Sequence, residues 1–148
     1  VMATPMTLGE EKFARLLRRY ETQCSIYKIP APNLVEIVEH GQVDTRKNID
    51  MLQRLFIPYR GRLDALVLGC THYPFASHTI SRILGGQVDI LDGGDGTARE
   101  TRRRLAEKDL LRQGPGEIIL ENSRNSPEIL RLSWRLLEGV QKTEDNDE

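Results

Sequence analysis

The expected fold depends most on one stretch of the sequence, Asp64-Ala65-Leu66-Val67-Leu68-Gly69-Cys70-Thr71-His72-Tyr73-Pro74. Its apolar residues run without alternation, which fits a strand buried on both faces of a parallel sheet. The run ends at a thiol, a hydroxyl and an imidazole, and Pro74 stands where a helix would make its first turn. Open α/β sheets bind their ligands where a strand feeds a helix N-terminus. The stretch therefore predicts a functional site at Cys70, Thr71 and His72.

Cys70 stands where a helix would favour the ionised form of a thiol. A cysteine just before a helix start faces the positive end of the macrodipole and several unpaired N–H groups. A protonated His72 beside it would add to the effect, so Cys70 is placed like a base or a nucleophile. The alternative is a buried structural cysteine, because free cysteine is among the most buried residue types. No metal site is predicted, because the chain has no second Cys or His pair at zinc-like spacing.

The rest of the chain alternates short apolar runs with helical patterns. Strands are expected at 1–4, 25–29, 64–69, 88–91 and 117–120, and helices after each of them. This order predicts an α/β fold, with a parallel sheet that has helices on both faces.

Several residues are expected to begin or end these helices. Thr7 with Glu10, and Thr97 with Glu100, have the spacing of a capping box. Asp44 is expected to cap the helix that ends near Pro58, and Gly41 and Gly85 to end the helices before them. The glycine-rich turn 92–96 matches no phosphate-binding fingerprint and is interpreted as a connection. The arginines of the helix after it alternate with glutamates, which predicts an exposed, ion-paired face.

Composition sets the broad class of the protein. The 148 residues suit one domain, and a formal net charge of −1 gives no electrostatic reason to expect a nucleic acid or membrane partner. The chain has two cysteines, no signal-like opening and no long apolar run. These features predict a soluble, cytoplasmic protein.

The motif from Leu68 to Pro74 resembles the signature around the second catalytic cysteine of the glutamate racemase family. Three further stretches resemble that family in the same order along the chain. Val1–Thr7 resembles the strand and threonine-bearing turn that open the second domain. Pro32–Gly41 resembles a helix with Glu39 at its acidic position, and Leu91–Gly94 resembles the turn after the cysteine helix. The resemblance extends from about Val1 to Leu137.

The resemblance implies cofactor-independent interconversion of L- and D-glutamate by two cysteines, for peptidoglycan synthesis and hence cell-wall biogenesis and cell shape. It implies that Cys70 is the base that removes the proton from L-glutamate. Thr71, His72 and Thr7 would bind the substrate, and His72 and Glu39 would assist proton transfer. From the residues alone, Thr7 is equally a helix cap, and Glu39 is a solvated charge in the last turn of a helix.

Two family segments are missing from the chain. Neither the Asp-Ser-Gly substrate loop nor the Cys-Asn-Thr motif of the first catalytic cysteine occurs in the sequence. We therefore expect a fragment that carries the second half of a racemase and has no appreciable racemase activity alone. Cys24 matches no family motif and is expected to be structural or exposed.

The resemblance also divides the chain. Residues 1–92 would form the second α/β domain, and residues 93–140 would complete the missing first domain. Residues 141–148 would be a disordered acidic tail. Because the 93–140 segment would lack its usual packing partner, its apolar stripe could lead to repacking or to a homodimer.

Two other functions remain open at this point. Cys70 and His72 are also the residue types of a cysteine-histidine hydrolase, in which a thiolate attacks an ester or amide. The chain could instead be a non-catalytic α/β module that binds a partner protein.

Overall fold

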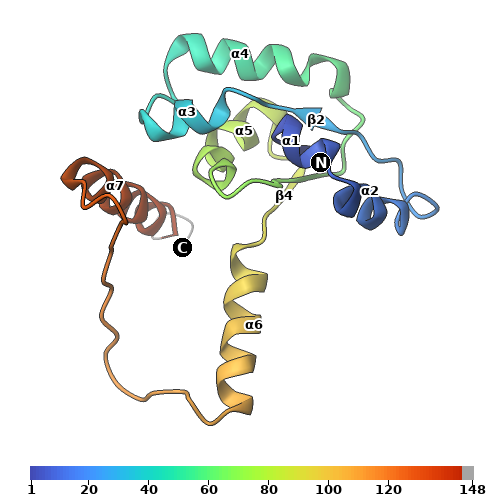
Figure 1. Cartoon of the computed structure of the whole chain (residues 1–148). Helices are drawn as coiled ribbons and strands as arrows, with labels where there is room; N and C mark the ends of the chain where they lie inside the picture. Colours follow the sequence, from blue (N-terminus) through green and yellow to red (C-terminus); the bar gives the residue numbers. More distant parts are fainter. Residues whose placement is uncertain (145–148) are drawn as a thin grey trace. The chain divides into compact units, whose positions relative to one another are not determined.

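The structure, a computed structural model, describes residues 1–144, with side-chain burial described up to Gly139. The chain divides into two units, Val1–Gly94 and Asp95–Glu148 (Figure 1). The boundary lies close to residue 92, but the interpretation of the second unit as a returning segment stays a prediction. Helix α7 (Pro127–Glu144) includes the first residues of the segment expected to be a disordered tail. The remainder of that segment, 145–148, lies outside the described residues.

The first unit is built on short parallel strands. Strand β1 (Met2–Ala3) pairs with β2 (Ile29–Pro30), and β3 (Ala65–Val67) pairs with β4 (Asp89–Leu91). A parallel bridge between Met2 and Leu68 joins the two pairs. The strand order is therefore β2-β1-β3-β4, which confirms the predicted α/β class with a parallel sheet.

Helices connect these strands. They are α1 (Pro5–Gly9), α2 (Glu11–Arg18), α3 (Leu34–Glu39), α4 (Arg46–Phe56), the 3₁₀ helices η1 (Ile57–Tyr59) and η2 (Tyr73–Ala76), and α5 (Ser77–Leu84). The connection from β1 leads to β2, at one edge of the sheet. The connection from β2 then crosses β1 and leads to β3, on the other side of β1. The right-handed rule for parallel crossovers predicts that α2 and the α3–α5 group lie on opposite faces of the sheet. Contacts of α4 and η2 with α5 fit this arrangement.

The core of this unit lies on one face of the β3–β4 pair. Leu66 and Leu68 are buried, together with Leu52 and Phe56 of α4 and Ile80 of α5. The prediction that β3 is buried on both faces was wrong, because Ala65 and Val67 on its other face are exposed.

Several helix ends differ from the predictions. Thr4, not Thr7, caps α1, and its Oγ1 accepts a hydrogen bond from the Thr7 N–H at 3.2 Å. Pro5 lies in the first turn, where its missing N–H costs nothing, so the helix begins earlier than a Thr7–Glu10 box would allow. Asp44 does not cap α4, because its carboxylate instead accepts a hydrogen bond from the Thr79 hydroxyl on α5.

The predicted glycine helix ends are found in the structure, whereas one predicted strand is shorter than expected. Gly41 and Gly85 have φ of 65° and 87°, which confirms the predicted left-handed helix ends. The strand expected at 25–29 is reduced to Ile29–Pro30, where backbone pairing with β1 begins.

The second unit is dominated by two helices, α6 (Gly94–Glu107) and α7. Thr97 does not cap α6, because the helix already begins at Gly94, whose N–H donates to the Asp92 carboxylate at 2.7 Å. The strand predicted at 117–120 is wrong, because these residues are irregular and mostly exposed. An isolated apolar run with no neighbouring strand cannot satisfy its backbone groups as a ladder.

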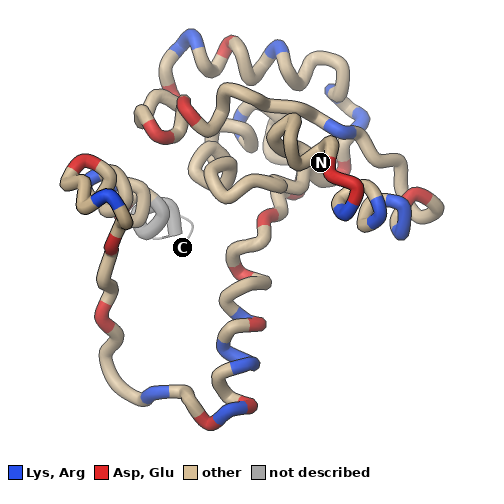
Figure 2. Tube along the Cα trace, viewed as in Figure 1, with Lys and Arg blue, Asp and Glu red and all other residues tan. Residues whose placement is uncertain are grey.

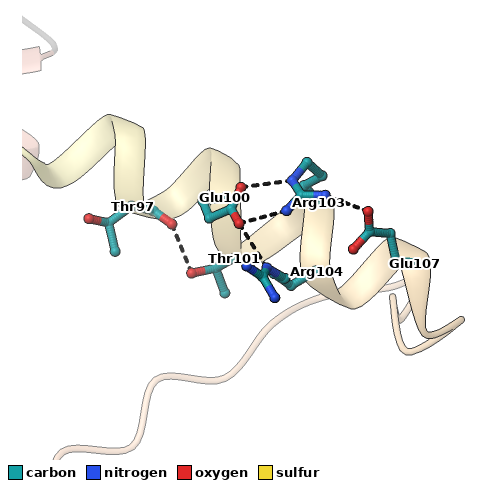
Figure 3. A network of polar contacts seen from close by, with 6 residues as sticks. All are labelled: Thr97, Glu100, Thr101, Arg103, Arg104 and Glu107. Carbon is teal, nitrogen blue, oxygen red and sulfur yellow. Dashed lines mark hydrogen bonds and ion pairs between the residues drawn. The ribbon is translucent and has the colours of Figure 1, made fainter.

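The charged face predicted for α6 is confirmed. Glu100 accepts hydrogen bonds from Arg103 and Arg104, and Arg103 also pairs with Glu107 (Figure 3). Charges of both signs follow one another along the helix (Figure 2). Within residues 1–144, no helix combines the length and the apolar character needed to cross a bilayer.

Candidate functional site

The site lies at the topological switch point of the sheet, where two neighbouring strands are followed by connections to opposite edges. Strands β1 and β3 are neighbours, and the chain leaves β1 toward one edge of the sheet and β3 toward the other. The loops that follow these two strands therefore part, and such switch points are where open α/β sheets bind ligands. Thr4 follows β1, and Cys70 follows the end of β3.

Gly69 allows the close approach of β1 to the end of β3. Its N–H donates to the Met2 carbonyl at 2.8 Å. A Cβ atom at Gly69 would lie 3.2 Å from the Ala3 Cβ and 3.4 Å from the Met2 oxygen. Glycine therefore fits this position because a side chain would push the two strands apart.

Cys70 begins the turn that leaves the sheet, and its side chain is half-buried and free of any disulfide. The Cys70 carbonyl accepts a hydrogen bond from the Tyr73 N–H at 3.1 Å, which closes the turn. The helix that follows differs from the prediction. Pro74 lies in the short 3₁₀ helix η2, and α5 begins only at Ser77. Because the macrodipole effect falls off within the first turn of a helix, α5 acts on Cys70 less than the sequence suggested.

His72 joins two elements that are far apart in the sequence. Its Nε2 lies 3.2 Å from the Oε1 of Glu39, at the end of α3, and its Nδ1 lies 3.4 Å from the Thr71 Oγ1. The side chains of His72 and Glu39 are 33% and 46% exposed. Both therefore remain accessible to a small molecule. A carboxylate can only accept, so in a neutral ring the proton lies on Nε2, which donates a hydrogen bond to Glu39. Nδ1 then accepts a hydrogen bond from the Thr71 hydroxyl.

Cys70 and His72 are neighbours but do not form a nucleophile–base pair here. Within the described residues, no hydrogen bond joins the Cys70 sulfur to His72, whose two ring nitrogens lie within bonding distance of Glu39 and Thr71. The geometry of a cysteine-histidine hydrolase is thus not present in this state of the chain.

The other candidates from the sequence make no hydrogen bond to this cluster within the described residues. The Thr7 hydroxyl lies 3.0 Å from that of Thr4. Thr7 lines a surface hollow of about 520 Å³ between α1 and α2, together with Phe13 and Leu16. Cys24 is exposed in the loop before β2, with its thiol 3.6 Å from the Tyr20 carbonyl.

Tyr73 is the site residue that the sequence reasoning missed. It is fully buried, and its hydroxyl donates a hydrogen bond to the Ala31 carbonyl at 2.7 Å. Burial, and secondarily the charge of Cys70, raises the pKa of Tyr73 to about 12. The signal for it was a polar aromatic residue inside the motif itself, directly before Pro74.

Nothing in the described residues suggests a metal centre, since no three His, Cys, Asp or Glu side chains gather closely enough to hold an ion. What the cluster offers is a thiol at the edge of a sheet beside an imidazole and a carboxylate. Such groups can accept, hold and return protons.

Comparison with known proteins shows which enzymes the chain is similar to. No protein-family model matches the chain. It is 40% identical over 141 residues to glutamate racemase from Clostridium botulinum and 43% identical over 141 residues to the enzyme from Clostridium acetobutylicum. Each match covers 93% of this chain and 55% of the relative. The chain therefore spans about half the length of these relatives.

Solved structures agree with the sequence comparison. Glutamate racemase from Francisella tularensis, in complex with D-glutamate, superposes with a TM-score of 0.73 at 21% identity, over 93% of this chain and 52% of that one. The Escherichia coli enzyme, in complex with L-glutamate and an activator, gives a TM-score of 0.69 at 23% identity, over 93% and 53%. At this identity the structural likeness concerns the fold alone. In sequence this chain is similar to about half of the curated glutamate racemases, and its fold matches about half of the solved ones.

Proposed function

We propose that this chain carries one of the two proton-transfer faces of a glutamate racemase. The observation that supports this most is the cluster at the end of β3. There Cys70 begins the turn, and His72 of the same turn lies 3.2 Å from Glu39 of α3. Sequence identity to glutamate racemases, and solved relatives that hold D- or L-glutamate, make glutamate the substrate that fits the proposal.

The reaction assigns Cys70 the role of a base. Its thiolate takes the α-proton of glutamate, so the C–H bond breaks, an S–H bond forms, and the electron pair stays on the α-carbon. The resulting carbanion is planar, and a proton returned from the same thiol restores the original enantiomer. Inversion needs a second acid on the opposite face. No cofactor takes part in this scheme.

The remaining roles follow from the same scheme. Thr71 and His72 bind the substrate, with Thr7 as a further contact from the neighbouring loop. Glu39 orients the imidazole of His72, which assists proton transfer. The described geometry does not support Cys24 as the second base. Cys24 lies before the start of β2, whereas Cys70 follows the end of β3. The isolated chain is therefore expected to be unable to invert glutamate.

Several further properties belong to this proposal. In the cell the reaction would take place in the cytoplasm and supply D-glutamate for peptidoglycan. The second unit would complete the other domain of the enzyme. In the isolated chain, exposed apolar side chains such as Ile129 and Trp134 would favour a homodimer. Sedimentation velocity over a range of concentrations measures that association directly.

The proposal is tested by hydrogen exchange at the α-carbon of glutamate. In deuterium oxide, the chain with L-glutamate should replace the α-hydrogen by deuterium with retention of configuration, as followed by proton NMR and chiral chromatography. Cys70→Ser should lower the exchange rate by roughly 10²- to 10⁴-fold, the usual contribution of a positioned base.

Cys24→Ser is the matched control, because it removes the only other thiol without touching the cluster. It should leave the exchange rate unchanged. Exchange that survives Cys70→Ser, or that is absent from the wild-type chain with both enantiomers, would contradict the proposed role of Cys70. Interconversion of L- and D-glutamate by the purified chain would overturn the prediction that this half is inactive in racemisation.

A further inference from the structure

Tyr73 connects the two segments that hold the proposed proton-transfer groups. Its N–H donates to the Cys70 carbonyl at 3.1 Å, and its hydroxyl donates to the Ala31 carbonyl at 2.7 Å. Ala31 precedes α3, the helix that ends at Glu39. One residue therefore connects the Cys70 turn, through its backbone, to the start of the helix that carries the carboxylate, through its side chain.

Hydrogen bonds to Ala31 hold the start of α3 in place. Besides the Tyr73 hydroxyl, it accepts the Leu34 N–H at 3.3 Å, and the Ala31 N–H donates to the Ala3 carbonyl of β1 at 3.2 Å. Ala31 is 5% exposed. The start of α3 is thereby tied to the sheet on one side and to Tyr73 on the other.

Packing makes this connection rigid. Tyr73 is fully buried, and Leu34 and Val38 on the inward face of α3 are each 1% exposed. Helix α3 contacts η2, the element that contains Tyr73. Because buried hydrogen bonds are made in surroundings of low dielectric constant, the Tyr73–Ala31 bond is stronger than an exposed one and is costly to leave unpaired.

We propose that Tyr73 is a positioning residue whose hydroxyl, through the Ala31 carbonyl and α3, sets Glu39 at hydrogen-bonding distance from His72. This inference rests on the proposed function for its catalytic meaning, but its geometric content is independent of activity. The pair that it positions is partly exposed and spans 33 residues, so the two side chains alone do not fix their separation. The raised pKa of Tyr73, about 12, keeps the phenol a donor at any working pH.

The first test is spectroscopic and uses the full chain. Glu39→Gln should shift the ring-nitrogen NMR signals of His72, because it removes the carboxylate that contacts Nε2. Tyr73→Phe should shift the same signals in the same direction, and the double variant should move them no further, because both changes act on one contact. Tyr20→Phe is the matched control, since it removes an exposed tyrosine hydroxyl, and it should leave the His72 signals in place.

A second measurement leaves Tyr73 intact, so it does not depend on how Tyr73→Phe folds. In a chain labelled with fluorotyrosine, Glu39→Gln should shift the fluorine signal of Tyr73 and leave that of Tyr20 unchanged, because coupling between two positions is reciprocal. A Tyr73 fluorine signal that does not shift in Glu39→Gln would overturn the proposal. So would ring-nitrogen signals of His72 that move in Glu39→Gln but stay at their wild-type positions in Tyr73→Phe.

The catalytic consequence is measured by α-hydrogen exchange. Tyr73→Phe should lower the rate at saturating glutamate on the order of tenfold, with little change in KM, since misplacement of a proton-transfer group by a fraction of an ångström slows the step more than it weakens binding. A change in KM alone would overturn this role. If the wild-type chain shows no exchange, the proposed function fails, whereas the His72 and fluorotyrosine measurements still decide the position of Glu39.

Discussion

The Cys70 turn and helix α6 both bring carboxylates to cationic or titratable partners, but they do so in opposite ways. Glu39 and His72 are 33 residues apart and meet because a buried core holds α3 against η2. Glu100 meets Arg103 and Arg104 within one helix, at i+3 and i+4, and every partner is exposed (Figure 3). The first contact is a product of the fold, whereas the second needs only a helix. The two regions should therefore respond very differently to the same kinds of perturbation.

The largest difference should appear when one leucine side chain is truncated in each region. Leu66→Ala removes a fully buried side chain from β3 and should lower the free energy of unfolding by roughly 2–5 kcal/mol. Leu105→Ala in α6 removes a side chain that is 37% exposed and should cost less than about 1 kcal/mol. Urea unfolding followed by circular dichroism gives both values.

Residue-resolved hydrogen exchange sharpens this comparison. Amides of β3 should lose protection in Leu66→Ala, while those of α6 stay unaffected in that variant. Equal costs for the two substitutions would mean that α6 belongs to the same cooperative core as β3, and the contrast drawn here would not hold.

The next difference concerns two carboxylates of the same type. Glu39→Gln should slow α-hydrogen exchange on the order of 10- to 100-fold, because the residue acts on the proton-transfer step through His72. Glu100→Gln makes the same chemical change on α6 and should leave the exchange rate unaltered. The measurement is the deuterium incorporation assay with L-glutamate at saturating concentration. An equal loss in both variants would point to a general effect on folding.

The same contrast explains what the sequence predicted. The α6 ion pairs were predictable, because a charge pattern and a helix period determine neighbours at i+3 and i+4. The place of Cys70 at the end of a parallel strand was also predictable, from an apolar run that stops at polar residues. Contacts that depend on tertiary packing were not. Neither the Tyr73–Ala31 bond nor the binding of Asp44 to Thr79 has a local signature.

The errors have the same physical origin. Apolar residues in β3 predicted burial on both faces, but pattern alone does not say whether a covering element is present, and Val67 is 39% exposed. The segment at 117–120 has the composition of a strand, but among residues 1–144 no strand pairs with it. The Glu39–His72 contact was expected only through the family resemblance, because a glutamate at the end of a helix is otherwise a surface charge.

The smallest effect should come from titrating Glu100. Hydrogen bonds from Arg103 and Arg104 lower the pKa of Glu100 from its usual 4.5 to about 2. A carboxyl whose folded-state pKa is lowered stabilises the helix above its unfolded pKa, and this contribution is lost as the pH falls through the folded-state value. The helix signal of α6 should therefore decline slightly between about pH 4.5 and pH 2.

Salt and a matched variant separate this effect from general acid unfolding. Because the side chains of the Glu100 network are exposed, 1 M salt should screen most of their attraction, whereas the Glu39–His72 contact, held by the surrounding fold, should persist. Carbon-detected NMR of the α6 backbone in the full chain measures local helicity. Glu100→Gln should remove the acid transition, and Glu117→Gln, in the irregular segment, should leave it. A transition that survives Glu100→Gln would show that α6 owes its acid sensitivity to contacts beyond its own helix. The contrast between contacts made within one helix and contacts made by the tertiary fold would then not hold for α6.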